Sequence, residues 1–164
     1  MLEPPAPPTS EELAALQALL ERSVASASPA VADSVAYAPR QMTAAELVEF
    51  WRSARLVAMA TVGTSGQPHV APIHAELHGT TLRLVVYEDA VRRHDVARNP
   101  RVAFTTWRDG AVVICYGRAR ELAGSLREAR PGQSGRARRV VALEVRLTRV
   151  YAMRPPERRA AEGT

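Results

Sequence analysis

Six apolar, β-type segments separated by turn residues dominate the sequence between residues 55 and 151. The strands are predicted at Arg55–Val62, Pro68–Leu77, Thr81–Tyr87, Val102–Trp107, Ala111–Glu121 and Val140–Tyr151. Glycine-containing turns at Gly63–Gly66, His78–Gly79 and Asp109–Gly110 join neighbouring strands in the manner of β-hairpins. A sheet of many short antiparallel strands leaves no exposed edges when it closes on itself. The pattern therefore predicts a mainly β fold, a six-stranded antiparallel barrel with flanking short helices.

The second predicted strand contains two prolines, Pro68 and Pro72. Proline has no backbone N–H and cannot donate to a neighbouring strand, so it is confined to sheet edges and irregular strands. We therefore expect this strand to have free backbone groups that could face a ligand.

Two capping boxes predict helices ahead of the barrel. Thr9–Glu12 precedes leucines at helical spacing, and Thr43–Glu46 precedes an apolar segment that ends near Ser53. A third helix is predicted over Ala90–Arg98, with Pro100 ending it. The apolar stripe of the first helix must pack on something, either the barrel or a second subunit.

Composition outside these elements suggests how the chain is divided. The Ala-, Ser- and Pro-rich stretch Ala25–Arg40 predicts a flexible linker, and the Gly-, Pro- and Arg-rich stretch Ala123–Arg138 predicts an exposed loop. Residues 1–42 are thus expected to form an N-terminal helix and linker, residues 43–153 the barrel domain, and residues 154–164 a disordered tail.

Cysteine content and hydropathy favour a cytoplasmic protein. Cys115 is the single cysteine, so no disulfide framework is possible within the chain. No apolar run approaches the roughly 20 residues needed to span a bilayer, and the start of the chain lacks the order of a signal peptide. We expect no contact with a membrane.

Charge is unevenly distributed along the chain. The 22 basic residues are all arginine, which excludes Schiff-base chemistry on a lysine. Residues 1–50 hold two arginines against seven acidic residues, whereas residues 51–164 hold twenty against ten. A positive field over the barrel favours anionic partners such as a phosphate-bearing cofactor or nucleic acid. The chain lacks the run of aromatic residues that base stacking would require, which disfavours nucleic acid.

Four motifs, in this order and spacing, resemble those of the pyridoxamine 5'-phosphate oxidase-like split-barrel flavoproteins. They are Leu56–Val62, Gly66–Ile73, Arg92 with Asn99–Val102, and Tyr116–Glu121. The resemblance covers about residues 43–153 and implies a six-stranded antiparallel split β-barrel. It also implies a homodimer with the cofactor at the subunit interface. FMN is the commonest cofactor of such proteins, and some branches use a deazaflavin coenzyme.

The resemblance further implies a set of cofactor-binding residues: Ala71, Pro72, Ile73, His74, Val86 and Arg92. The segment from Ala71 to His74 matches the strand that lies along the flavin ring, largely through backbone groups. Arg92 stands eight residues before Pro100, where the family usually has a phosphate-binding lysine, and a guanidinium can bind a phosphate in two places. No catalytic residue is implied, because the cofactor carries the hydride chemistry.

Several positions depart from the family pattern. Ala90 and Val91 replace the serine or threonine and the arginine that often precede the phosphate-binding position, and Ala71 replaces a basic residue of the oxidase. Glu88 and Asp89 add negative charge near the expected phosphate site. We therefore do not expect pyridoxamine phosphate oxidase activity.

Three function classes remain open from the sequence. The first is an oxidoreductase that uses FMN or a deazaflavin coenzyme to transfer hydride to or from a small organic substrate. The second is a non-catalytic split barrel that binds or stores a flavin, haem or a related ligand, and the third is a nucleic-acid-binding barrel. His69, His74 and His94 lack the ligand spacing of a zinc motif, so no metal site is predicted.

Overall fold

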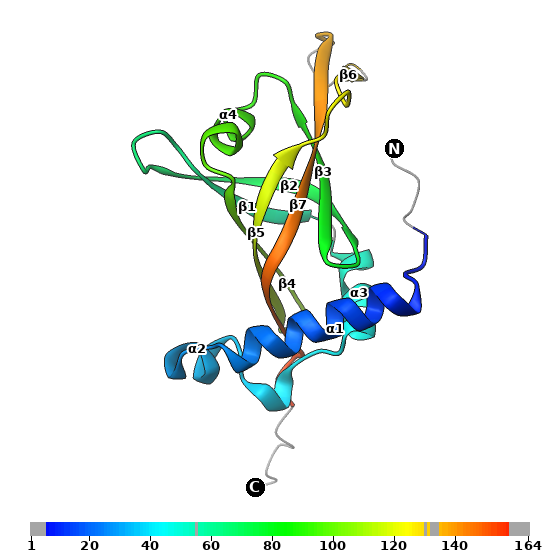
Figure 1. Cartoon of the computed structure of the whole chain (residues 1–164), viewed down its shortest axis with the longest axis vertical. Helices are drawn as coiled ribbons and strands as arrows, with labels where there is room; N and C mark the ends of the chain where they lie inside the picture. Colours follow the sequence, from blue (N-terminus) through cyan, green and yellow to red (C-terminus); the bar gives the residue numbers. More distant parts are fainter. Residues whose placement is uncertain (1–5, 55, 130, 132–134, 158–164) are drawn as a thin grey trace, which may run out of the picture.

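The core of the molecule is a closed, six-stranded antiparallel barrel (Figure 1). The computed structural model describes residues 6–54, 56–129, 131 and 135–157. The barrel strands are β1 (Leu56–Val62), β2 (Pro68–His78), β3 (Thr81–Tyr87), β4 (Arg101–Arg108), β5 (Ala111–Glu121) and β7 (Arg138–Met153). They are hydrogen-bonded in the order β3-β2-β1-β4-β5-β7, and pairing of β3 with β7 closes the ring. The predicted fold class is confirmed.

The long strand β7 closes the barrel by pairing with two strands. It lies against β5 on one side, and on the other it pairs with β3 from Thr81 opposite Arg146 to Tyr87 opposite Val140. The register with β5 shifts between Tyr116 and Gly117, which marks a β-bulge. A Cβ at Gly117 would lie 2.6 Å from the carbonyl oxygen of Arg146. Only glycine fits this close approach of the two backbones.

Strands β2 and β3 diverge, and this divergence splits the barrel. From Pro68 to His74, β2 pairs with β1, whereas it pairs with β3 only over Ala75–His78. Beyond that point β3 pairs with β7 instead. Among the strands that the structure describes, the first half of β2 therefore has a partner on one edge only, and Pro68 and Pro72 both lie in it. The prediction of an edge strand from these prolines is confirmed.

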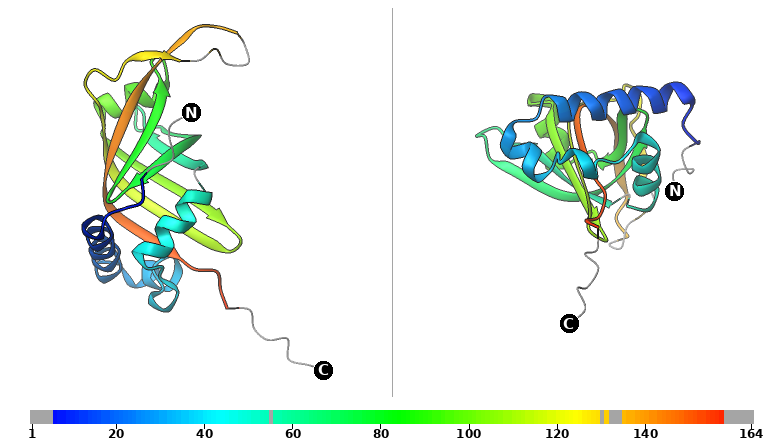
Figure 2. Two further views of the ribbon diagram at one scale, coloured as in Figure 1. Left: turned by 90° about the vertical axis from the view of Figure 1, so that its right-hand side faces the viewer. Right: turned by 90° about the horizontal axis from the view of Figure 1, so that it is seen from below.

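Helices cover the two ends of the barrel. They are α1 (Ser10–Ala25), α2 (Pro29–Ser34), the 3-10 helix η1 (Ala38–Arg40), α3 (Ala44–Ser53) and α4 (Val91–Arg98). Both predicted capping boxes form, at Thr9–Glu12 and at Thr43–Glu46. Figures 1 and 2 show α1 and α3 at one end of the barrel and α4 at the other.

Short helices occupy part of the stretch that composition suggested was a flexible linker. Pro29 stands in the first turn of α2, and η1 also has a proline near its start. Proline is compatible with the first turn of a helix because the N–H it lacks would have no partner there. The prolines of Ala25–Arg40 therefore mark the starts of helices as well as interruptions of regular structure.

The segment predicted as the loop Ala123–Arg138 contains one further short strand. Strand β6 (Arg127–Ala129) pairs with the start of β7 and forms a hairpin that extends beyond the barrel. Arg130 and residues 132–134 lie outside the described residues, as do residues 158–164 of the predicted tail. In the described part of the chain, no helix has both the length and the apolar character needed to cross a membrane.

Helix α1 docks on the barrel, which decides between the two alternatives for its apolar stripe. Leu16, Leu19 and Leu20 are buried in the core. The buried Ser23 hydroxyl donates to the carbonyl of Leu19 at 2.7 Å and accepts from the N–H of Val150 at 2.9 Å. One side chain thus joins α1 to β7 inside the protein.

The Ser23 contact predicts a clear stability effect. Replacing Ser23 with alanine leaves the buried N–H of Val150 without a partner, which costs about 1–3 kcal/mol. Ser34→Ala is the control, since the exposed Ser34 hydroxyl bonds only within its own helix. We expect chemical denaturation to show this loss for Ser23→Ala and little change for the control. Equal stability of the two variants would contradict the docking role.

Candidate functional site

The six residues implied by the sequence resemblance lie on the three elements that border the split. Ala71, Pro72, Ile73 and His74 belong to the half of β2 that has a free edge. Val86 lies on β3 after its divergence from β2, and Arg92 lies in the first turn of α4. The fold therefore brings one backbone edge and one basic side chain to the same end of the barrel.

The burial of these residues determines which groups a ligand could reach. Ile73 and Val86 are 8 % and 2 % exposed, so their side chains belong to the core. Pro72 and His74 are exposed on the outer face of β2, and Arg92 is partly exposed. A ligand at the split would therefore meet the β2 backbone, the side chains of Pro72 and His74, and the guanidinium of Arg92.

Arg92 differs from its neighbour Arg93 in its contacts. The Nε of Arg93 lies 2.7 Å from Oε2 of Glu121, and its Nη1 donates to the carbonyl of Glu88 at 3.0 Å. The side chain of Arg92 forms no hydrogen bond or ion pair with any residue among those described. A partly buried guanidinium without a carboxylate partner can bind an anion in a charge-assisted contact.

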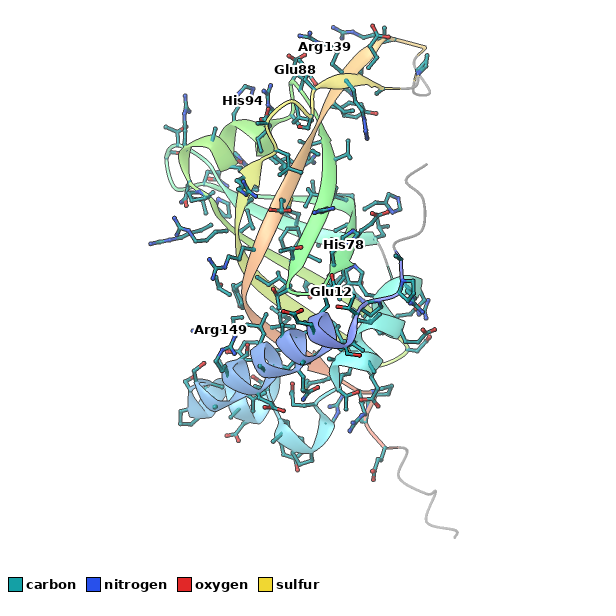
Figure 3. All side chains as sticks on the ribbon, turned by 45° about the vertical axis from the view of Figure 1, so that its right-hand side comes forward. Glu12, His78, Glu88, His94, Arg139 and Arg149 are labelled. Carbon is teal, nitrogen blue, oxygen red and sulfur yellow. The ribbon has the colours of Figure 1, made fainter. Side chains whose placement is uncertain are left out.

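The two acidic residues near Arg92 are paired with arginines of β7. Nη2 of Arg139 lies 2.7 Å from Oε1 of Glu88, and Nη2 of Arg138 lies 2.7 Å from Oδ1 of Asp89. Figure 3 shows Glu88 and Arg139 together at the same end of the barrel. The hydrogen bond from Arg138 lowers the pKa of Asp89. The negative charge of Glu88 and Asp89, which the sequence analysis noted near the expected phosphate site, is thus locally balanced.

A buried carboxylate that sequence reasoning did not single out fixes α4 in place. Asp95 on α4 is 6 % exposed. Its Oδ2 accepts from the Thr61 hydroxyl at 2.6 Å and lies 2.7 Å from Nδ1 of His69. Burial raises the pKa of Asp95, but the hydrogen bonds from His69 and Thr61 outweigh burial and leave the pKa below its ordinary value. The ionised carboxylate can only accept, so Nδ1 of His69 carries the hydrogen.

This cluster joins α4 to the β1–β2 hairpin. Thr61 lies near the end of β1, and His69 lies at the start of β2. The turn between them packs against the imidazole, since a Cβ at Gly63 would lie 2.8 Å from Cε1 of His69. Arg92 lies one turn before Asp95 on the same helix, so the cluster also fixes the position of Arg92. The one signal in the sequence is that Asp95 directly precedes the apolar Val96 within the predicted helix Ala90–Arg98.

An exposed apolar area lies on the outer face of β1, β2 and β4. Leu56, Val70 and Trp107 are 56 %, 70 % and 68 % exposed. Next to them is a groove of about 250 Å³, lined by Leu56, Val57, Ala58, Pro72, Thr105, Thr106 and Trp107. Trp107 is therefore not a core residue. Contiguous exposed apolar patches, when large, are typical of interaction sites.

Two other kinds of chemistry find no support in the described residues. Burial raises the pKa of the Cys115 thiol to about 12, so this side chain is not a nucleophile. No group of three His, Cys, Asp or Glu side chains in that part of the chain could hold a metal ion.

Comparison with known proteins identifies a family for most of the chain. Residues 43–154 match the family described as Pyridoxamine 5'-phosphate oxidase. No curated protein matches the sequence.

Solved structures with the same fold have low sequence identity to this chain. The conserved hypothetical protein Rv2991 from Mycobacterium tuberculosis is 16 % identical with a TM-score of 0.60, covering 77 % of this chain and 96 % of its own. An FAD-binding protein from Mesorhizobium loti is 19 % identical with a TM-score of 0.52, covering 69 % and 93 %. The haem storage protein HutZ from Vibrio cholerae is 12 % identical with a TM-score of 0.52, covering 66 % and 93 %. At these identities the likeness shows the fold alone.

The buried carboxylate predicts a specific pH dependence of stability. The pKa of Asp95 is lower in the folded protein than in the unfolded chain, where it is about 4. Ionised Asp95 therefore stabilises the fold above that value, and the contribution is lost as the pH falls through the folded pKa. We expect the free energy of unfolding to fall less between neutral and acidic pH in Asp95→Asn than in the unmodified protein.

The exposed Asp33 of α2 provides the control for this measurement. Asp33→Asn should keep the pH dependence of the unmodified protein in denaturation experiments. If Asp95→Asn also keeps it, the Thr61–Asp95–His69 cluster does not contribute to stability as described.

Proposed function

The chain belongs to the pyridoxamine 5'-phosphate oxidase family, and on this basis we propose that it is a flavin-dependent oxidoreductase. Its cofactor is FMN or a deazaflavin coenzyme, and its substrate is a small organic molecule that exchanges hydride with the cofactor. The observation that carries the proposal is the free edge of β2 together with the unpaired Arg92 on α4, the helix that Asp95 joins to His69 of β2. This arrangement fits a planar heterocycle that carries a phosphate.

The residues around the split have separate roles in this proposal. The backbone of Ala71–His74 lies along the ring and exchanges hydrogen bonds with its polar edge. Pro72 contributes no N–H, so it leaves room for an apolar contact at that point. Arg92 binds the phosphate, and the Thr61–Asp95–His69 cluster keeps Arg92 in position. A bound flavin supplies the hydride chemistry, while the protein supplies binding, orientation and charge.

A second subunit completes the site in this proposal. The apolar groove beside Pro72 has a volume of about 250 Å³. Small-molecule sites usually have about 300–1,000 Å³ and enclose most of the ligand. A second copy packed on the exposed Leu56, Val70 and Trp107 would deepen the groove and cover these side chains. The protein therefore works as a homodimer with the cofactor at the interface.

One observation favours the alternative of a non-catalytic barrel that binds or stores haem. The imidazole of His74 is exposed on the strand that borders the split. Histidine is a common axial ligand of haem iron. The haem storage protein HutZ has the same fold. Absorption spectroscopy of the purified protein distinguishes the alternatives, because flavin and haem have different spectra and only a bound haem would lose an iron ligand in His74→Ala.

The phosphate role of Arg92 predicts a loss of cofactor affinity. Arg92→Ala removes a charge-assisted hydrogen bond worth about 1.5–3 kcal/mol, so FMN or the deazaflavin coenzyme should bind roughly 10- to 150-fold more weakly. Arg98→Ala is the matched control, since Arg98 lies on the same helix but bonds to Thr64. Isothermal titration calorimetry measures both affinities. Equal affinities of the two variants would remove Arg92 from the phosphate site.

The dimer proposal predicts a change of oligomeric state. Trp107→Glu places a charge in the proposed interface and should convert a dimer into a monomer in analytical ultracentrifugation, because a buried unpaired charge is strongly unfavourable. Leu126→Glu is the control, since Leu126 is also exposed but lies directly before β6, at the opposite end of the barrel from Trp107. A monomeric unmodified protein, or a dimeric Trp107→Glu, would contradict the proposed interface.

A further inference from the structure

Three arginines from different strands lie side by side on the outer face of the barrel. Arg101 of β4 is the register partner of Arg118 of β5, and Arg118 is the register partner of Arg146 of β7. Register partners in antiparallel strands point to the same face of a sheet. All three residues are exposed. The barrel thus carries a continuous row of positive charge across three strands.

This row lacks a carboxylate such as the one that the neighbouring row contains. Two residues further along the strands, Glu144 lies between Arg83 and Arg120, with N–O distances of 3.4 Å and 2.7 Å. The side chains of Arg101, Arg118 and Arg146 form no ion pair with another residue in the described ranges. Like charges directly opposite each other destabilise a sheet. A bound anion would remove this cost.

An aromatic side chain and a fourth arginine adjoin the row. Tyr116 lies two residues before Arg118 on the same face of β5, and it is 44 % exposed. Its register partner is Arg149 of β7, which is also exposed. Figure 3 shows Arg149 on the flank of the barrel, next to α1. The face therefore combines a planar stacking surface with a grid of guanidinium groups.

The shape of this surface selects the kind of ligand. Neighbouring strands are about 4.8 Å apart, so the row from Arg101 to Arg146 extends over about 10 Å. Small molecules bind in concave sites, whereas these arginines spread over the outer face of a sheet. Guanidinium groups bind phosphates in two places, and an aromatic ring stacks on any unpaired base. The features fit an extended chain of phosphates that carries bases.

We propose that the outer face of β4, β5 and β7 binds single-stranded nucleic acid, with phosphates on Arg101, Arg118 and Arg146 and one base stacked on Tyr116. This site is separate from the split and does not depend on the cofactor. The absence of an aromatic run disfavoured nucleic acid in the sequence, but the strand register assembles this site from residues far apart in the chain.

Salt-dependent binding of a labelled single-stranded oligonucleotide of about ten nucleotides tests the proposal by fluorescence anisotropy. Each neutralised phosphate contributes about −0.7 to the slope of log K against log salt, so three or four arginines give a slope between about −2 and −3. Arg118→Gln should reduce the slope by about 0.7. Tyr116→Ala should weaken binding about fivefold or more without changing the slope.

Arg120→Gln is the matched control, because it removes an arginine of the same strand and face that forms an ion pair with Glu144. It should leave the slope unchanged. Arg118→Gln should also melt no lower than the unmodified protein, since it relieves repulsion, so weaker binding would not reflect unfolding.

Four results would overturn the proposal. They are no binding at low salt, equal slopes for Arg118→Gln and Arg120→Gln, equal affinity for single-stranded and duplex oligonucleotides, and equally effective competition by polyglutamate. The last would show that the face recognises anions in general rather than a phosphate chain. Unchanged oligonucleotide binding by Arg92→Ala would show that this site is independent of the proposed cofactor site.

Discussion

The antiparallel pairing of β3 with β7 is the interaction on which the rest of the structure depends. It closes the barrel and buries the core, and it draws β3 away from β2 beyond Leu84. The free edge of β2 is therefore a consequence of barrel closure. Gly117 has no Cβ, so the backbones of β5 and β7 can approach each other closely at the bulge. One set of backbone hydrogen bonds thus stabilises the fold and creates the opening at which we place the cofactor.

Ionic contacts on either side of α4 determine which charged side chains are available to a ligand at this opening. Arginines of β7 pair with Glu88 and Asp89 in the connection that leads into the helix. On the other side, Asp95 holds the helix to the β1–β2 hairpin through Thr61 and His69. These contacts hold α4 on both sides. Among the described residues, the guanidinium of Arg92 at the split is left without an acidic partner. Because the helix that carries Arg92 is already fixed, only the Arg92 side chain has to be ordered when it binds an anion, which lowers the entropic cost of binding.

Local rules account for the part of this structure that the sequence could predict. Turn glycines, alternating apolar segments and two capping boxes depend on residues close together in the chain, and the strands and helices formed where these signals stood. Proline is compatible both with a flexible linker and with the first turn of a helix, and in Ala25–Arg40 the structure has helix starts. The balance of Glu88 and Asp89, the burial of Asp95 and the arginine row all depend on strand register or tertiary contacts. Such contacts join residues that are distant in sequence, so local patterns do not determine them.

Hydrogen–deuterium exchange over residues 68–74 tests the central claim most directly. If a flavin-type ring lies along the free edge of β2, saturating FMN or deazaflavin coenzyme should slow amide exchange in this segment and in the first turn of α4. Exchange in β5, whose strand has partners on both edges, should remain unchanged. Unchanged exchange in residues 68–74, with either cofactor bound, would contradict the account.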